Sequence, residues 1–134
     1  MTVNIDLSLS DELKIYRDTL ERIVPEKIEP ILASYPPDEP LPRDGCVKIR
    51  ELLTPLGIQA CRVPLEHGGS GLGAVGLGIA AETIPYEAFE LLMCMEVVAL
   101  RICLGGNDAL KKKYVPRIVR GDKFAGSEIG RAHV

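Results

Sequence analysis

The run EAFELLMCMEVVALRICL, Glu87 to Leu104, decides the fold that this sequence predicts. Apolar residues fill most of its positions, and Glu96 and Arg101 interrupt its longest apolar part. A helix that is apolar on nearly every face is normally buried on all sides. We therefore expect 87–104 to form the central helix of a bundle. The run is too short and too often interrupted by charges to predict a membrane span.

A first helix is predicted well before this run. Ser10 is placed to cap it, because a serine side chain can accept a hydrogen bond from the first turn. Its apolar residues recur at helical spacing: Leu13, Tyr16, Leu20, Ile23 and Val24. Pro25 and Pro30 are expected to kink or end it. The proline-rich stretch 34–45 then predicts a surface connection.

Two more helices are expected between this connection and the central run. One begins with Asp44 as its cap and stops at Gly57, a residue that tolerates the left-handed backbone of a helix end. The other runs from about Ala74 to Pro85 and is weakened by its internal glycines. Between the two lies an extended piece followed by a glycine-rich loop, VPLEHGGSGLG, Val63 to Gly73.

The last predicted helix lies in GNDALKKKYVPRIVRGDK, Gly106 to Lys123. Asn107 is expected to cap it, Pro116 to break it into two pieces, and Gly121 to close it. We find no internal repeat and no convincing pair of strands. The fold class predicted from the sequence is therefore all-α, an orthogonal or up-down bundle of about five or six helices.

Composition excludes several classes of function. The chain has 134 residues, enough for one domain, with 46% hydrophobic residues and a formal net charge of −3. This charge does not favour capture of nucleic acid or of an anionic membrane. The four cysteines form no CxxC pair, and His67 and His133 offer no zinc spacing, so no metal ligand is assigned. The amino terminus does not resemble a secretory signal, and we expect a reduced, cytoplasmic protein.

The glycine-rich loop matches parts of two functional motifs, a dinucleotide-binding site and an esterase oxyanion loop, but the neighbouring sequence favours neither. Gly71-x-Gly73-x-x-Gly76 matches a dinucleotide fingerprint, which requires a strand leading directly into the glycines. Pro64 and several polar residues stand in that place. His67-Gly68-Gly69-Ser70 is similar to the oxyanion loop of esterases, but no GxSxG elbow accompanies it. We expect the glycines to serve the backbone, by allowing sharp turns and close packing.

Three adjacent lysines and an apolar stripe of the central helix each have a structural and a functional interpretation. Lys111, Lys112 and Lys113 could meet a phosphate, but three adjacent helical positions cannot share one face, which favours a solvated surface. Phe89, Met93, Val97 and Leu100 follow one stripe of the central helix. They could line a cavity for an apolar ligand, or belong to an ordinary bundle core.

Two segments carry a resemblance to a known family. The first offers Gly57, Ile58, Val63, Pro64, Gly68, Gly69, Gly71 and Leu72, with Leu65 before Glu66 as a departure. The second offers Gly106, Asn107, Asp108, Lys111, Lys113, Tyr114, Val115, Pro116, Gly121 and Asp122. In this order and at this separation, the two segments resemble the amino-terminal helical domain of the acyl-CoA dehydrogenases.

The resemblance implies an oxidoreductase that acts on a CH–CH bond. Members of the family add a middle β-domain and a carboxy-terminal helical bundle, and hold FAD mainly between these two. A carboxylate removes the α-proton of an acyl-CoA thioester, and the β-hydrogen leaves as hydride to the flavin, which gives a 2-enoyl-CoA. Electrons pass to electron-transfer flavoprotein, and the complete enzymes are homo-oligomers.

For this chain the resemblance implies a limited role. The catalytic carboxylate of the family lies in the carboxy-terminal domain, so no catalytic residue and no FAD-binding residue is assigned here. The amino-terminal domain supplies a wall of the acyl pocket, and by position this role falls on Phe89, Met93 and Val97. We expect the chain alone to bind no FAD and to have no dehydrogenase activity. The alternative is a stand-alone, non-catalytic helical module that binds acyl-CoA or a partner protein.

The last seven residues, EIGRAHV, predict a non-native tail. Their back-translation resembles read-through of a common sequencing adapter, in which a stop codon follows. We therefore expect a helical domain over residues 1–127, a non-native segment over 128–134, and a natural sequence interrupted near Ser127.

Overall fold

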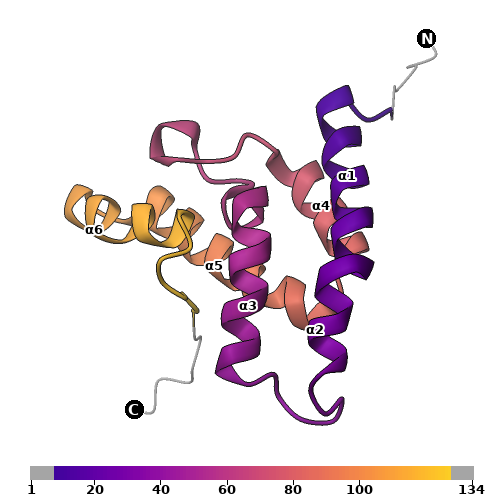
Figure 1. Cartoon of the computed structure of the whole chain (residues 1–134). Coiled ribbons are helices and arrows are strands. Elements are labelled where there is room, and N and C mark those ends of the chain that lie inside the picture. Colours follow the sequence, from indigo (N-terminus) through magenta and orange to yellow (C-terminus); the bar gives the residue numbers. More distant parts are fainter. Residues whose placement is uncertain (1–7, 128–134) are drawn as a thin grey trace, which may run out of the picture.

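The computed structural model describes residues 8–127, and every regular element in this part of the chain is helical. The elements are α1 (Asp11–Ile23), α2 (Glu29–Ala33), α3 (Arg43–Leu53), α4 (Gly73–Thr83), α5 (Tyr86–Gly105) and α6 (Asp108–Val119). In Figure 1, α1 and α3 stand upright, α5 passes behind α3, and α6 extends sideways to the left of α3. The predicted all-α bundle is confirmed. The predicted boundary between 1–127 and 128–134 falls at the edge of the described residues and stays a prediction.

Helix α1 ends just before the first of the two prolines, but the chain stays helical beyond it. Ser10 caps it as expected, because its Oγ accepts a hydrogen bond from the backbone N–H of Leu13 at 3.3 Å. At Pro25, however, the chain continues through a π-helical turn, Val24–Ile28, into α2. A proline lacks the N–H of a regular helix, and a π turn is one way for a helix to continue through such a position. Pro30 lies in the first turn of α2, where a proline is tolerated. The expectation that a proline kinks or ends the helix therefore holds at Pro25, where the regular α-helix stops and a π turn begins, but not at Pro30.

The connection after α2 also differs in detail. Helix α3 begins at Arg43, preceded by Pro42 as its cap residue, so Asp44 lies inside the first turn and is not the cap. Its carboxylate accepts a hydrogen bond from the hydroxyl of Tyr35 at 2.6 Å, and Lys48 Nζ lies 3.5 Å away. This interaction holds the pKa of Asp44 below its usual range. The aspartate therefore ties the connection to α3.

The remaining helix ends mostly follow the prediction. Gly57 adopts a left-handed φ of +75° after a short 3₁₀ turn, Thr54–Leu56. Asn107 caps α6 by accepting a hydrogen bond from the N–H of Leu110 at 2.9 Å. Gly121, with a φ of +76°, follows its end. Pro116 does not break α6, contrary to expectation, because the buried side chains of the same helix keep it packed against α5.

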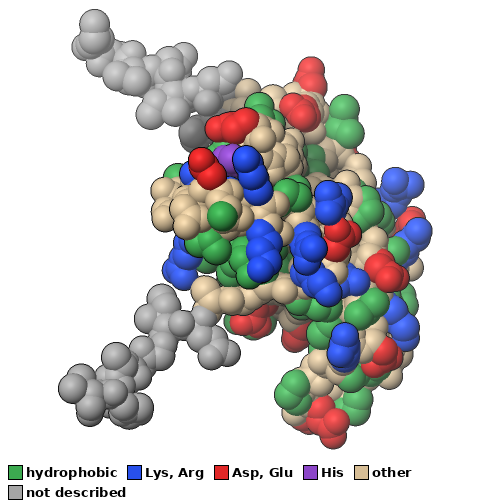
Figure 2. Space-filling view, turned by 90° about the vertical axis from the view of Figure 1, so that its left-hand side faces the viewer, with side chains coloured by type: hydrophobic (Ala, Val, Ile, Leu, Met, Phe, Trp, Pro, Cys, Tyr) green, Lys and Arg blue, Asp and Glu red, His purple; other side chains and the backbone are tan. Residues whose placement is uncertain are grey.

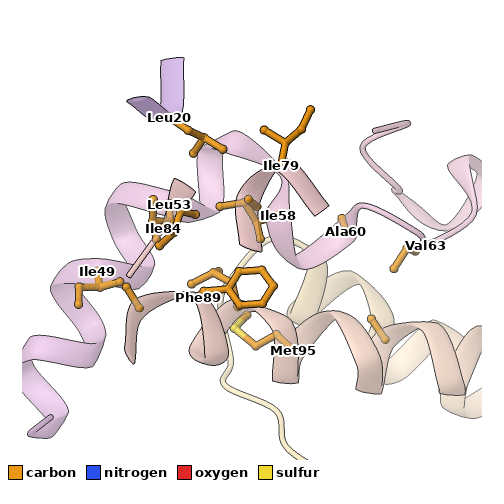
Figure 3. Close-up of a cluster of buried hydrophobic side chains, with 14 of the residues drawn as sticks. Leu20, Ile49, Leu53, Ile58, Ala60, Val63, Ile79, Ile84, Phe89 and Met95 are labelled. Atoms are coloured by element: carbon orange, nitrogen blue, oxygen red, sulfur yellow. The ribbon is translucent and has the colours of Figure 1, made fainter. Parts of the chain in front are cut away.

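The core lies where α5 meets the other helices (Figure 3). Leu20 from α1, Ile49 and Leu53 from α3, and Ile58 from a 3₁₀ turn (Ile58–Ala60) are fully buried. Phe89 and Met95 meet them from α5 in the same cluster. Burial of each such side chain stabilises the fold by roughly 1.5–3 kcal/mol before its entropy is counted.

Helix α5 is not buried on all sides, in contrast to the sequence prediction. One arc of the helix is buried: Ala88, Phe89, Leu92, Met95, Glu96, Ala99 and Cys103. The opposite arc includes Glu90 and Arg101, both exposed, and ends at Leu104, which is 76% exposed. The neighbouring elements cover only part of the helix, so an apolar surface remains along it. In the described part of the chain, no helix has the length and apolar character needed to span a membrane.

Candidate functional site: the two sides of helix α5

The three predicted pocket residues lie along one edge of the buried arc of α5. Phe89 is 9% exposed and belongs to the core. Met93 and Val97, one and two turns further along, are half-buried, as is Leu100. Because residues four apart advance by about 40° around a helix, the stripe turns gradually from the core to the surface. The structure therefore leaves Met93 and Val97 accessible and places Phe89 behind them.

The accessible side of α5 contains residues that the sequence analysis did not assign to a site. Glu90, Cys94 and Arg101 follow the surface at intervals of four and seven residues, next to Val97. All are exposed or half-buried. A helical projection of the run would have found them once the buried arc was known, but the apolar composition alone could not say which arc this is.

The buried side of α5 contains a doubly hydrogen-bonded ion pair that the sequence analysis missed. Glu96 is completely buried, and its carboxylate accepts hydrogen bonds from Arg62 Nε at 2.8 Å and from an Arg62 terminal nitrogen at 2.7 Å. The backbone N–H of Arg62 adds a third bond at 3.2 Å. Two parallel bonds between a guanidinium and a carboxylate are strong and directional. The available signal was a lone carboxylate in an apolar run, which requires a partner.

This ion pair fixes the chain that leads into the glycine-rich loop. Arg62 lies between the 3₁₀ turn Ile58–Ala60 and the loop, whereas Glu96 lies in the middle of α5. The hydrogen bonds to Glu96 favour the charged form of Arg62 and raise the pKa of its guanidinium above its ordinary value. The pair thereby ties the start of the loop to α5.

The glycines of the loop allow sharp turns and close packing of the backbone, as the sequence predicted. Gly68 and Gly71 have left-handed φ values of +89° and +78°. At Gly69 an added Cβ would collide with the carbonyl oxygen of Val63, so only glycine fits. Gly73, with a φ of +65°, begins α4 and donates its N–H to the carbonyl of Cys61 at 2.9 Å. The glycines therefore form a tightly folded turn.

The same geometry does not fit the phosphates of a dinucleotide such as FAD. A 3₁₀ turn, Leu65–His67, precedes the glycines, where the fingerprint needs a strand. The N–H groups of Gly73 and Gly76, at the start of α4, already bond to carbonyls of the chain itself. These groups are therefore not free to receive an anion. We assign no FAD contact to this loop.

A buried group of polar side chains lies beneath the loop. Tyr16, which is 8% exposed, and Cys61, which is 2% exposed, belong to this group together with Ser70. The Cys61 thiol donates a weak hydrogen bond to the carbonyl of Gly57 at 3.7 Å, and the buried hydroxyls of Tyr16 and Ser70 have no hydrogen-bond partner among the described residues. Burial raises the pKa of the Cys61 thiol to about 11, and the nearby carboxylate of Glu96 adds to this effect. Burial likewise raises the pKa of Tyr16 above its usual range. A thiol with so high a pKa is a poor nucleophile near neutral pH, so Cys61 is structural.

The lysines of α6 are spread around the helix. Lys111 is half-buried, Lys112 and Lys113 are exposed, and Lys113 lies over the ring of Tyr114 at 5.2 Å. Figure 2 shows acidic and basic side chains interspersed on one face of the molecule. This arrangement fits the solvated surface that the sequence analysis favoured. Among residues 8–127, no group of three or more histidine, cysteine or acidic side chains is arranged to hold a metal ion.

Most of this sequence is similar to sequences of known proteins. The model of the acyl-CoA dehydrogenase N-terminal domain matches residues 10–122. A glutaryl-CoA dehydrogenase of Desulfococcus multivorans is 30% identical over 91% of the chain and 32% of its own length. A (2S)-methylsuccinyl-CoA dehydrogenase of Cereibacter sphaeroides is 28% identical over 85% of the chain and 21% of its own length.

A cyclohex-1-ene-1-carbonyl-CoA dehydrogenase of Syntrophus aciditrophicus is also 28% identical, over 91% of the chain and 30% of its own length. The chain thus spans about a third or less of the relatives it matches. The match to the domain model includes the two segments that carry the resemblance, the glycine-rich loop and the capped helix α6. This chain belongs to the acyl-CoA dehydrogenase N-terminal domain family.

Proposed function

We propose that the chain is the amino-terminal part of an FAD-dependent acyl-CoA dehydrogenase and forms one wall of the acyl pocket. The observation that supports this role is the half-buried apolar edge of α5, on which Met93 and Val97 remain accessible. Phe89 supports this edge from the core. Apolar side chains on a rigid helix suit an acyl chain, because contact with it removes apolar surface from water.

The relatives indicate the class of substrate. Glutaryl-CoA, (2S)-methylsuccinyl-CoA and cyclohex-1-ene-1-carbonyl-CoA, which their names give, are all CoA thioesters. Their acyl groups differ widely in shape, so we propose an acyl-CoA substrate without specifying its acyl group. The proposed reaction is α,β-dehydrogenation to a 2-enoyl-CoA. We assign neither its catalytic base nor its cofactor contacts to residues 8–127.

The proposed cofactor is FAD, which would accept a hydride from the β-carbon of the substrate. This chain's own contribution is to position the acyl group and to exclude water from it, through Met93 and Val97. The proposal includes electron-transfer flavoprotein as electron acceptor, homo-oligomeric assembly and a cytoplasmic location. The free state of all four cysteines, Cys46, Cys61, Cys94 and Cys103, fits a reducing compartment.

A chimera tests this function. Residues 10–122 would replace the matching segment of the glutaryl-CoA dehydrogenase of Desulfococcus multivorans, and the purified protein would be assayed with a panel of acyl-CoA thioesters. We expect flavin-dependent formation of a 2-enoyl-CoA. A chimera that folds and holds FAD but oxidises none of the thioesters would contradict the proposal.

The alternative, a stand-alone module that binds acyl-CoA, is tested with the chain itself. If the dehydrogenase proposal is right, the isolated chain carries no flavin absorbance near about 450 nm, the usual flavin band. It also binds acyl-CoA weakly, because only one wall of the pocket is present. Micromolar binding of acyl-CoA to the isolated chain would favour the module instead.

A further inference from the structure

The ion pair between Arg62 and Glu96 lies on the same turn of α5 as the proposed acyl wall. Glu96 comes three residues after Met93 and one residue before Val97. Successive residues of a helix are turned by about 100°, so Glu96 leaves α5 about 60° around the axis from Met93 and about 100° from Val97. Glu96 is completely buried, whereas Met93 and Val97 are half-buried. The pair therefore joins α5 to the rest of the domain at the turn that carries the wall.

The geometry of this pair fixes an orientation as well as a position. The guanidinium and the carboxylate meet through two bonds of 2.8 and 2.7 Å, and paired bonds of this kind are directional. The third bond, at 3.2 Å, comes from the backbone N–H of Arg62, so the carboxylate is also tied to the main chain. A rotation of α5 by about 20° would move its Cα atoms by about 0.8 Å and disturb all three bonds.

Stability alone gives little reason for a buried ion pair at this place. Removing two charges from water is costly, and apolar side chains of similar volume often give equal or higher stability. The neighbours of Glu96 on the buried arc, such as Leu92, Met95 and Ala99, are apolar and completely buried. Their contacts hold α5 against the core but are non-directional. What the pair adds to these contacts is a defined rotation of the helix about its axis.

We propose that Arg62 and Glu96 are positioning residues, whose ion pair sets the rotation of α5 and thereby selects which acyl groups fit against Met93 and Val97. The selection of acyl groups rests on the proposed function, but the rotation of α5 is a property of the chain itself. Displacing a substrate by about 1 Å can lower the rate of its reaction about a hundredfold. A wall that is held at a defined rotation can therefore discriminate between acyl groups of different bulk.

The two methionines of α5 can report its rotation in the chain as it exists. Met93 is half-buried and Met95 is completely buried, and Met1 is the only other methionine of the sequence. Carbon-13 labelling of the methionine methyl groups therefore gives few signals. A soluble paramagnetic probe broadens each signal according to the exposure of its methyl group. In the unaltered chain we expect the signal of Met93 to broaden more than that of Met95.

A double variant removes the pair without leaving a buried charge. In Arg62→Met/Glu96→Gln both charges are lost together, and the amide oxygen at position 96 can still accept the backbone N–H of residue 62. We expect the ratio of broadening, Met93 over Met95, to fall about twofold or more, because rotation of α5 exposes one methyl group at the expense of the other.

A matched variant separates this effect from a loss of stability. Leu20→Ala, at a fully buried position of α1, lowers the free energy of unfolding but leaves the pair intact, so it should keep the ratio. Thermal unfolding of both variants checks that each is folded. An unchanged ratio in the double variant would overturn the proposal, and so would an equal fall of the ratio in Leu20→Ala.

The chimera with the glutaryl-CoA dehydrogenase tests the selection of acyl groups. We expect the double variant to narrow the ratio of kcat/KM between straight and branched acyl-CoA thioesters about tenfold, with FAD content unchanged, because the wall loses its defined placement. Leu20→Ala should keep this ratio. An active chimera whose ratio the double variant leaves unchanged would overturn the proposal. An unaltered chimera that holds FAD but oxidises no thioester would instead contradict the proposed function, and the methyl signals would still decide whether the pair sets the rotation of α5.

Discussion

The two sides of α5 have similar apolar sequences but opposite environments. On one side, Leu92 and Met95 are fully buried, and Glu96 is sealed by its ion pair with Arg62. On the other side, Val97 and Cys94 stay half-buried, next to exposed Glu90 and Arg101. The first side holds the domain together and the second remains available for contact with other molecules. Hydrophobicity alone does not distinguish a structural face from a binding face, whereas the packing of neighbouring elements does.

The largest expected difference between the two sides is in stability. Leu92→Ala should lower the free energy of unfolding by about 2–5 kcal/mol, because it leaves a cavity in a core that cannot close around it. Met93→Ala, on the accessible edge, should cost about 1 kcal/mol or less. Urea unfolding measures both values. Equal losses would mean that the two sides of α5 are packed alike.

The ion pair that seals the buried side gives the next largest effect. Arg62→Ala leaves the carboxylate of Glu96 buried without its counter-charge. We expect a loss of about 2–3 kcal/mol, below the value for a fully buried pair because the Arg62 side chain is 38% exposed. Arg62→Lys keeps the charge but not the paired geometry, and should cost less.

A double-mutant cycle with Glu96→Gln isolates this interaction. The coupling energy between Arg62 and Glu96 should be well above the error of the measurement, on the order of 1 kcal/mol or more. Additive effects of the two substitutions would show that the pair does not hold the loop to α5.

The thiol beneath the loop predicts how stability changes with pH. Because the pKa of Cys61 is raised to about 11, the folded protein keeps a proton that the unfolded chain loses above about pH 8.5. Stability is therefore fully present below that pH and falls as the pH rises toward 11, by roughly 3 kcal/mol. The raised pKa of Tyr16 acts in the same direction at higher pH.

Unfolding measured between pH 7 and pH 10.5 tests this dependence, with Cys61→Ala as the matched variant. The alanine variant should be less stable at neutral pH but show a smaller decline in alkaline solution. If its decline equals that of the unaltered chain, Cys61 is not the group responsible.

The smallest effect concerns the cap of helix α6. Asn107→Ala removes the side-chain oxygen that accepts from Leu110 and should cost about 1 kcal/mol. Asn107→Ser retains a capping oxygen and should cost only a few tenths. Melting temperatures of the two variants would check this order, and a neutral Asn107→Ala would show that α6 is held by its packing on α5 alone.

The sequence predicted those features of the fold that depend on local chemistry. Ser10 and Asn107 cap their helices, and Gly57 and Gly121 adopt the left-handed conformation of helix ends. The family resemblance is confirmed by the match over residues 10–122. At each of these caps and helix ends, the interacting groups lie within a few residues of one another, so the local sequence is enough to predict them.

Predictions that depended on distant contacts were less successful. Pro116 was expected to break α6, but packing against α5 keeps the helix continuous. Glu96 looked like an interruption of the apolar run, and its partner Arg62 lies 34 positions away in the sequence. The buried arc of α5 was likewise not predictable, because it is set by which elements pack against the helix. Phe89, the first residue of the predicted pocket stripe, packs in the core, and its contact with a substrate stays a prediction.

The central claim is that the accessible edge of α5 contacts the acyl group of the substrate. In the chimera with the glutaryl-CoA dehydrogenase, Met93→Trp would extend a large ring from this edge. Ile15→Trp, on an exposed site of α1, is the control. We predict that Met93→Trp lowers kcat/KM for long acyl groups at least tenfold relative to short ones, equivalent to about 1.4 kcal/mol in the transition state, and that Ile15→Trp leaves this ratio unchanged. An unchanged ratio in a Met93→Trp chimera that still holds FAD would contradict the account.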